Sequence, residues 1–296
     1  MRKSQIISLI ILLVGVTVTI WIGALAGNNR GGEAKPSPTA TGESATDVPS
    51  TPAPTEVPAE SDPANLPADT ILWSPSVSEG RFSPNVDGDI LTQMAKYDCY
   101  YDGSAFGDGG AYLTFDISYG DPDDIKNIGI VLDALRAANV KGIFFLTNEF
   151  FKGQVTDIVN RIINEGHLLG NRGKIVSGND MTKMSIAEYR AALAENEASL
   201  KAIVGDSVKM KYYRPLGNRF SIRDLAIAQQ MGYKTLMFTS LYAREGLDNL
   251  SERMRTEVID NAVYDIMIYA VDGQSERLSS AISETAGRIT IKQLPS

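Results

Sequence analysis

The sequence predicts an α/β fold, a distorted and incomplete (β/α) barrel in which helices surround parallel strands. From residue 71 onward, short β-prone runs alternate with longer segments whose apolar residues recur every three or four positions. This alternation is typical of strand–helix–strand units, in which the strands are parallel. The run 142–147 is almost uniformly apolar, as a strand covered on both faces should be. The number of expected strands suits a barrel at least as well as an open doubly wound sheet.

The individual elements follow from these periodicities and from the residues that flank them. Strands are expected at 111–115, 142–147, 167–170, 211–214, 235–239, 265–269 and 289–292. Helices are expected at 124–138, from Thr156 to Gly166, from Ser185 to Gly205 and at 221–231. Ser185 and Glu188 have the spacing of a capping box, and Thr156 is expected to cap the helix that it begins.

Polar side chains stand at the carboxyl ends of four expected strands. These residues are Asp116, Asn171, Arg214 and Tyr269. Active sites of (β/α) barrels lie at the carboxyl ends of the strands. We therefore expect these four residues to border one site.

The composition excludes some classes of function. The chain has 296 residues and a formal net charge of −8, so it lacks the basic surface that nucleic-acid phosphates require. Cys99 is the single cysteine, which excludes a disulfide within the chain and is expected to be a small buried side chain. His167 is the single histidine and is expected to be structural, because one histidine cannot assemble a transition-metal site.

The chain is expected to divide into a cytoplasmic tip (1–5), an apolar anchor (6–27), a disordered Pro-, Ser- and Thr-rich linker (28–70) and a folded domain (71–296). The anchor is long enough to cross a hydrocarbon core of roughly 30 Å as a helix. Arg2 and Lys3 precede it, which favours a single-pass protein of the cell membrane with the folded domain outside. A cleaved signal peptide, which would yield a secreted protein, is the alternative.

Several segments together resemble a known family. They include VLDALRAANVKGIFFLTNEFF, VNRIINEGHLLGN, MKYYRPLGNRFSIRDLAIAQQMGYKTLMFTS and the strand IMIYAV. In pattern they resemble the NodB-type polysaccharide deacetylases (carbohydrate esterase family 4), most of all the subgroup that deacetylates muramic acid in peptidoglycan. The resemblance implies the distorted (β/α) barrel of that family.

The resemblance also implies a metal site that this sequence has lost. Members bind zinc or another divalent metal through one Asp and two His, and a second Asp acts as general base. Here TFDISYG places Asp116 at the base position and Ile117 at the ligand position. The two histidine ligand positions hold Arg172 and Val176, and Tyr269 replaces the acid histidine. No metal and no other cofactor is therefore expected.

Other positions of the family site are retained or remain polar. Arg214, which would position the base, is kept and is expected to lie beside Asp116. A groove that still binds a glycan would be lined by Tyr119, Asn171, Arg172, Lys174, Pro215 and Asn218. The expected function is an inactive, membrane-tethered protein that binds peptidoglycan or another cell-wall glycan. The alternatives are an active metal-dependent N-deacetylase with a non-standard site, and a scaffold or regulator that pairs with an active deacetylase or another envelope protein.

Overall fold

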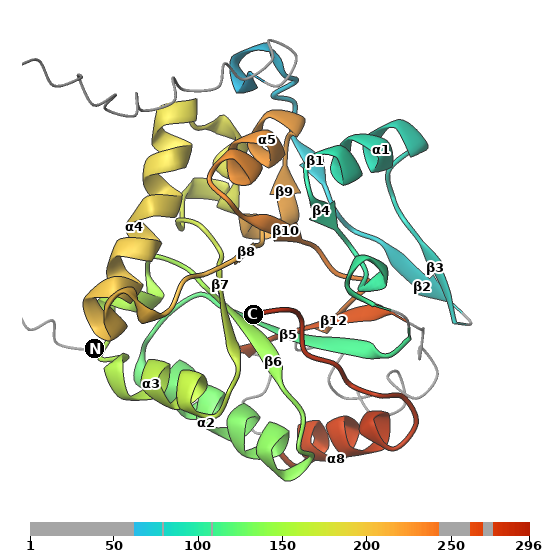
Figure 1. Ribbon diagram of the computed structural model, residues 1–296, viewed down its shortest axis with the longest axis vertical. Coiled ribbons are helices and arrows are strands. Elements are labelled where there is room, and N and C mark those ends of the chain that lie inside the picture. The colour runs from blue at the N-terminus through green and yellow to red at the C-terminus, as the bar shows by residue number, and fades with distance from the viewer. Residues whose placement is uncertain (1–61, 79, 108, 243–260, 269–274) are drawn as a thin grey trace, which may run out of the picture. The chain divides into compact units, whose positions relative to one another are not determined.

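The structure is a computed structural model that describes residues 62–78, 80–107, 109–242, 261–268 and 275–296. Among these residues, eight parallel strands form one curled sheet in the order β11-β12-β5-β6-β7-β8-β10-β4 (Figure 1). The strands are β4 (Cys99–Tyr100), β5 (Ala111–Ile117), β6 (Gly142–Leu146), β7 (Leu168–Asn171), β8 (Tyr212–Tyr213), β10 (Lys234–Leu236), β11 (Ser240–Tyr242) and β12 (Ala262–Met267). The prediction of a distorted, incomplete barrel is confirmed.

Helices cover the outside of this sheet. They are α1 (Gly88–Lys96), α2 (Pro122–Ala137), α3 (Thr156–Asn164), α4 (Ile186–Val204), α5 (Ile222–Gln230) and α8 (Ser275–Ala286). Short 3-10 turns lie at η2 (Pro63–Asn65), η3 (Ser104–Phe106), η4 (Phe150–Lys152), η5 (Ser177–Asn179), η6 (Met181–Lys183), η7 (Gly205–Ser207) and η8 (Leu216–Asn218). Two small antiparallel pairs flank the sheet: β1 (Ile71–Leu72) with β9 (Arg219–Phe220), and β2 (Ser76–Ser78) with β3 (Arg81–Ser83).

The helix boundaries show which local signals were interpreted correctly. The capping box of Ser185 and Glu188 begins α4, as predicted. Helix α2 begins at Pro122, because the Asp121 carboxylate accepts hydrogen bonds from the backbone N–H groups of the first turn. The prediction for Thr156 was wrong: it is the first helical residue of α3, and the preceding Val155 makes no side-chain cap.

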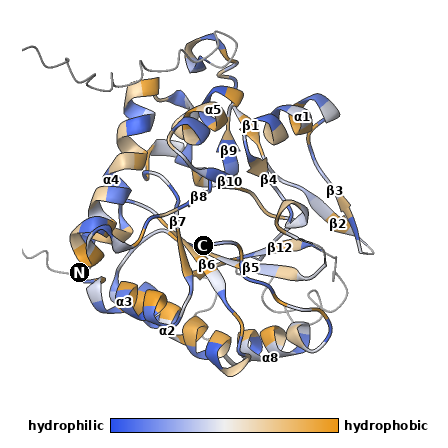
Figure 2. Ribbon diagram, in the orientation of Figure 1, coloured by the Kyte–Doolittle hydropathy of each residue, from blue (hydrophilic) through white to orange (hydrophobic). Residues whose placement is uncertain are grey.

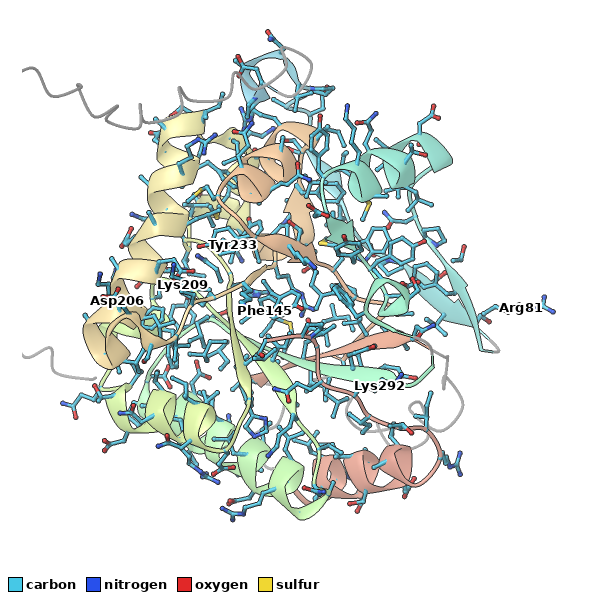
Figure 3. The ribbon with its side chains drawn as sticks, viewed as in Figure 1. Arg81, Phe145, Asp206, Lys209, Tyr233 and Lys292 are labelled. Atoms are coloured by element: carbon cyan, nitrogen blue, oxygen red, sulfur yellow. The ribbon has the colours of Figure 1, made fainter. Side chains whose placement is uncertain are left out.

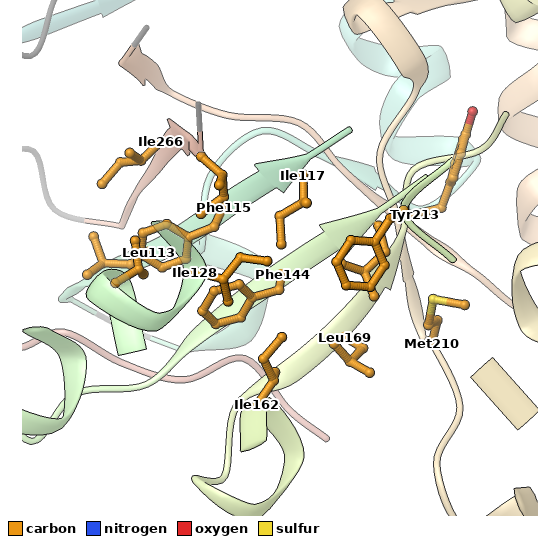
Figure 4. Packing of buried hydrophobic residues seen from close by; sticks show 14 of the residues in the cluster. Leu113, Phe115, Ile117, Ile128, Phe144, Ile162, Leu169, Met210, Tyr213 and Ile266 are labelled. Atoms are coloured by element: carbon orange, nitrogen blue, oxygen red, sulfur yellow. The ribbon is translucent and has the colours of Figure 1, made fainter. Parts of the chain in front are cut away.

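Side chains of the central strands alternate between two apolar clusters. Leu113 and Phe115 of β5 face the helices and join the buried stripe of α2 (Figure 4). Tyr112 belongs to the other cluster and faces the inside of the barrel. This alternation is the period of two that any strand imposes on its side chains. Helices α2, α3 and α8 each carry hydrophobic and hydrophilic residues, as helices that cover a sheet should (Figure 2). On β5, Thr114 and Asp116 therefore share the inner face with Tyr112.

The expected strand at 289–292 does not form. Its contact with the sheet is an isolated bridge between Ile291 and Ala111, flanked by the bonds from Ala111 N to Thr290 O and from Lys292 N to Ala111 O. The segment thus meets only the beginning of β5, and the apolar alternation that predicted a strand instead packs Ile289 and Ile291 against the core.

The predicted tip and anchor, and the linker as far as residue 61, lie outside the described residues. The described body begins at residue 62, where Pro63 is buried and the Pro67 carbonyl accepts a hydrogen bond from Arg223 N (3.0 Å). Within the described ranges, none of the helices has the length and apolar character needed to cross a membrane.

Candidate functional site

The site is centred on Asp116, near the carboxyl end of β5, where a buried strand delivers a carboxylate to the inner face of the sheet. Two guanidinium groups contact it. Arg214 follows β8 and places Nη1 3.2 Å from Asp116 Oδ1, as expected for the pair. Arg172 follows β7, and its Nη2 is in ion-pair contact with Asp116 Oδ2. The three side chains are almost completely removed from solvent.

Arg214 is held on every side. Its Nε and Nη2 donate to the carbonyls of Leu236 (2.8 Å), the last residue of the neighbouring strand β10, and of Met237 (3.1 Å), which follows it. Its Nη1 donates to Thr114 Oγ1 (2.9 Å), and the guanidinium stacks over the Phe145 ring at 4.3 Å. These fixed contacts make Arg214 a rigid part of the barrel interior.

Asp265 is the fourth charged member of the cluster, and the sequence analysis missed its role. It lies inside β12, where its Oδ1 is 2.5 Å from Arg214 Nη1 and accepts a hydrogen bond from Thr114 Oγ1 (2.9 Å). The available signal was an acid inside the apolar run 262–268, which a strand buried on both faces tolerates only with a partner. Asp116, Asp265, Arg172 and Arg214 thus form a buried cluster of two carboxylates and two guanidiniums, called here the charge cluster.

The pKa values of the two carboxylates in the charge cluster are shifted in opposite directions. Burial alone would raise the pKa of Asp116, but the guanidiniums of Arg172 and Arg214 outweigh it and hold that pKa below its usual value. Burial raises the pKa of Asp265 to about 7, with the neighbouring Asp116 adding to the shift and Arg214 opposing it. Asp116 therefore loses its proton at a lower pH than Asp265 does.

The residues predicted to line the groove differ in burial and in their contacts. Asn171 is buried: its Nδ2 donates to Leu193 O (2.9 Å), and its Oδ1 accepts from Gly173 N (2.9 Å). Lys174 is ion-paired with Glu195 at 3.0 Å. These contacts make Asn171 part of the framework and neutralise Lys174, and the contact with Asp116 similarly occupies Arg172. Arg172 and Lys174, both predicted to line the groove, are thus each paired with a carboxylate of the protein.

The other predicted residues lie around the same end of the sheet. Tyr119, just after β5, has 49% of its surface exposed. Pro215 is buried next to Arg214, and Asn218 has a left-handed backbone (φ 59°) with its carbonyl accepting from Trp73 N (2.9 Å). Tyr269, the predicted replacement of the acid histidine, lies outside the described residues. Tyr119 is thus the candidate that presents a large ring to solvent.

Comparisons with known proteins agree with this architecture. Residues 104–236 match the polysaccharide deacetylase family. The chain contains a polysaccharide deacetylase domain of the NodB type. It is 26% identical over 222 residues to the peptidoglycan-N-acetylmuramic acid deacetylase of Bacillus subtilis, which covers 73% of this chain and 81% of that protein. The matches to three curated relatives cover 60%, 81% and 34% of the length of those relatives, so one of them spans only about a third of its relative.

Solved structures give the same fold. The carbohydrate esterase family 4 structure of that Bacillus subtilis protein superposes with a TM-score of 0.63 at 24% identity, covering 75% of this chain and 94% of that one. A family 4 pseudoenzyme from Bacillus anthracis superposes with a TM-score of 0.50 at 19% identity, covering 60% and 61%. A mutant of that pseudoenzyme is described as having restored enzymatic activity.

The metal ion that polysaccharide deacetylases use does not fit the residues found here. Ile117, at one ligand position, is fully buried in the helix-facing cluster, and Val176, at another, packs against the same cluster. Neither side chain has an atom that can coordinate a cation. At the third position Arg172 already places a fixed positive charge on Asp116. At the positions that the sequence assigns to metal ligands, the structure thus has apolar contacts and an internal ion pair, which do not fit a divalent cation.

His167 of the deacetylase domain does not compensate for the lost ligands. It is buried and directly precedes β7. Its Nδ1 accepts a hydrogen bond from Gly142 N (3.1 Å), and burial lowers its pKa to about 4. Gly142 begins β6, at the opposite end of that strand from the charge cluster. Cys99, in β4, is buried as expected. Both residues have the structural surroundings that the sequence indicated.

Proposed function

We propose that this domain is a non-catalytic member of the polysaccharide deacetylase family that binds a cell-wall glycan at the carboxyl end of the sheet. The observation that supports it is the position of Arg172. In the family a divalent cation is expected beside the base, and here a guanidinium occupies the place next to Asp116. A guanidinium carries charge but has no vacant coordination position with which to activate a water or polarise a carbonyl.

The protonation state of Asp116 supports the same proposal. A general base must accept a proton during the reaction and works best with a pKa near the working pH. The guanidiniums of Arg172 and Arg214 hold the pKa of Asp116 below its usual value, against the effect of burial. Asp116 therefore has the properties of a structural anion.

Glycan binding is supported by what is left on the surface. Tyr119 projects its ring at the carboxyl end of β5, where carbohydrates could stack on it. The Bacillus subtilis relative is named for its action on peptidoglycan, which makes peptidoglycan the first glycan to test. A membrane anchor at 6–27 followed by the Pro-rich linker would hold the domain outside the cell, near that polymer. A family member described as a pseudoenzyme shows that the fold is used without activity elsewhere.

The first experiment measures acetate release by the full chain from peptidoglycan and from N-acetylated oligosaccharides, with zinc or cobalt added. The wild-type protein should release no more acetate than Asp116→Asn, since neither should activate water. Metal-dependent release that disappears in Asp116→Asn would refute the proposal and favour an active deacetylase whose ligands come from other residues.

A second experiment measures co-sedimentation of the full chain with purified peptidoglycan. Tyr119→Ala should weaken binding about two- to tenfold, because stacking of one aromatic ring contributes roughly 0.5–1.5 kcal/mol. Tyr119→Phe is the matched control, because it keeps the exposed ring and removes only the hydroxyl. Equal binding by both variants would remove Tyr119 from the proposed surface.

A further inference from the structure

A cavity lies at the opposite end of the sheet from the charge cluster. It has a volume of about 780 Å³ and is bordered by the second half of α4, the connection 205–211, the first residue of β8 and the segment 231–234 that leads into β10. Figure 3 shows Asp206, Lys209 and Tyr233 beside α4 in this region. Lys211 directly precedes β8 and Arg214 directly follows it, so the strand separates the cavity from the charge cluster. A volume of this size is typical of small-molecule sites, which occupy roughly 300–1,000 Å³.

The cavity is basic in a chain that is acidic overall. Its side chains include Lys201, Lys209, Lys211 and Lys234, against the two acids Glu197 and Asp206. The exposed pair of Lys201 and Asp206, 2.6 Å apart, neutralises one charge of each sign. Three lysines then remain against one carboxylate, whereas the whole chain has a formal net charge of −8. Such a local surplus of positive charge raises the concentration of small anions at the site.

The one remaining acid is restrained by the protein. Glu197 accepts a hydrogen bond from the Tyr233 hydroxyl at 3.0 Å, and that hydroxyl also accepts from Asn171 Nδ2 at 3.0 Å. Burial raises the pKa of Glu197, which weakens its repulsion of a bound anion. The carboxylate is thus held by the Tyr233 hydroxyl and by the backbone of Met210, and the charge of Lys209 partly opposes the effect of burial on its pKa.

The walls between these charges are largely apolar. Met210, Tyr212 and Tyr233 are buried and contribute to the lining, together with Val208 and Met231. Tyr212 is fixed by the bond from its hydroxyl to Pro295 O (3.0 Å). An apolar lining with a few converging charged groups is the usual construction of a site for a small ligand that carries a charge.

We propose that this cavity binds a small molecule that carries a phosphate or carboxylate, with Lys209 and Lys211 contacting the anion and the Met210, Tyr212 and Tyr233 wall contacting its body. The proposal does not rest on glycan binding at the carboxyl end of the sheet. The anion could come from the carboxylate of an acidic sugar or from a phosphate ester, and matched probes separate these sources.

The test is a titration of the full chain by calorimetry with four probes. N-acetylmuramic acid is compared with N-acetylglucosamine, which lacks the carboxylate, and glycerol 3-phosphate is compared with glycerol. At least one anionic probe should bind about tenfold or more tightly than its neutral partner, as expected for a charge-assisted contact. Equal binding within both pairs, or no binding by any probe, would overturn the proposal.

Variants locate the binding. The double variant Lys209→Gln/Lys211→Gln should bind the anionic probe about tenfold more weakly, since two charged donors are lost. Lys152→Gln is the control, because Lys152 is equally exposed but lies after β6, at the carboxyl end of the sheet. Equal loss in both variants would indicate non-specific attraction and overturn the proposal. Tyr119→Ala should leave anion binding unchanged, so the two proposed sites can fail independently.

Discussion

The two ends of the sheet use charge in opposite ways. At the carboxyl end, the positive charges of Arg172 and Arg214 are buried and matched by Asp116 and Asp265. At the amino end, lysines around the cavity are exposed and outnumber the acids. Because a buried charge must be compensated inside the protein while an exposed one need not be, the first set serves the fold and the second remains available to ligands.

Removing a member of the charge cluster should have the largest effect on stability. Arg214→Met leaves Asp116 and Asp265 sharing the single guanidinium of Arg172 and frees the carbonyls of Leu236 and Met237. The free energy of unfolding should fall by about 3–5 kcal/mol, the usual effect of breaking a buried ion pair. Urea unfolding followed by circular dichroism measures it.

The matched substitution at the other end is Lys201→Met, which breaks the exposed ion pair with Asp206. Its effect should be no more than about 1 kcal/mol, because solvent screens exposed pairs. A loss as large as that of Arg214→Met would mean that the two ends do not differ in the way described.

The titration of Asp265 should give the next largest effect. Its pKa of about 7 in the folded protein lies above the unfolded value of roughly 3.9, so its contribution to stability is present below about pH 4 and is lost as the pH rises through 7. Asp265→Asn cannot lose a proton. The variant should therefore gain stability relative to wild type between pH 5 and pH 8, by about 1 kcal/mol or more.

Urea unfolding of the wild type and of Asp265→Asn at pH 5 and pH 8 tests the sign of the change in their difference in unfolding free energy. Asp116, whose folded pKa is lowered, contributes stability that is lost only in more acidic solution, so it does not affect this window. A difference that moves the other way would place the ionised form on Asp265.

A further prediction concerns Tyr233, the tyrosine that joins the two ends. Tyr233→Phe removes the hydroxyl between Asn171 and Glu197 and should cost about 1–2 kcal/mol of unfolding free energy. Tyr97→Phe is the control, because the buried Tyr97 hydroxyl has no hydrogen-bond partner among the described residues. Its loss should be neutral or slightly stabilising, and equal effects in both variants would contradict the role given to the Tyr233 hydroxyl.

The sequence predicted what depends on local pattern and missed what depends on strand register. The period of two placed Asp116 at the end of a strand, and the resemblance placed Arg214 beside it. The role of Asp265 depends on its pairing opposite Thr114 across β12 and β5, residues about 150 positions apart. No local pattern encodes that register. For the same reason the ion pairs of Arg172 and Lys174 were not predicted, since their partners Asp116 and Glu195 come from other elements.

The cavity at the amino end could not be predicted for a related reason. Its lining comes from a helix, a connection, two strand beginnings and the segment at 295–296, which meet only when the barrel is folded. Its lysines are spread over residues 201–234 and look in sequence like an ordinary solvated surface.

The guanidinium on Asp116 has a consequence for how such a protein depends on its surroundings. A metal ion binds reversibly from the surrounding solution and can be removed by chelators or exchanged for another ion. The activity of a metal-dependent protein therefore depends on the concentration of that ion. Arg172 is part of the polypeptide, so the positive charge next to Asp116 is present as soon as the chain folds. On the proposed function, the barrel should therefore reach the same state in metal-poor and metal-rich environments, and its stability should respond to acidity through Asp265.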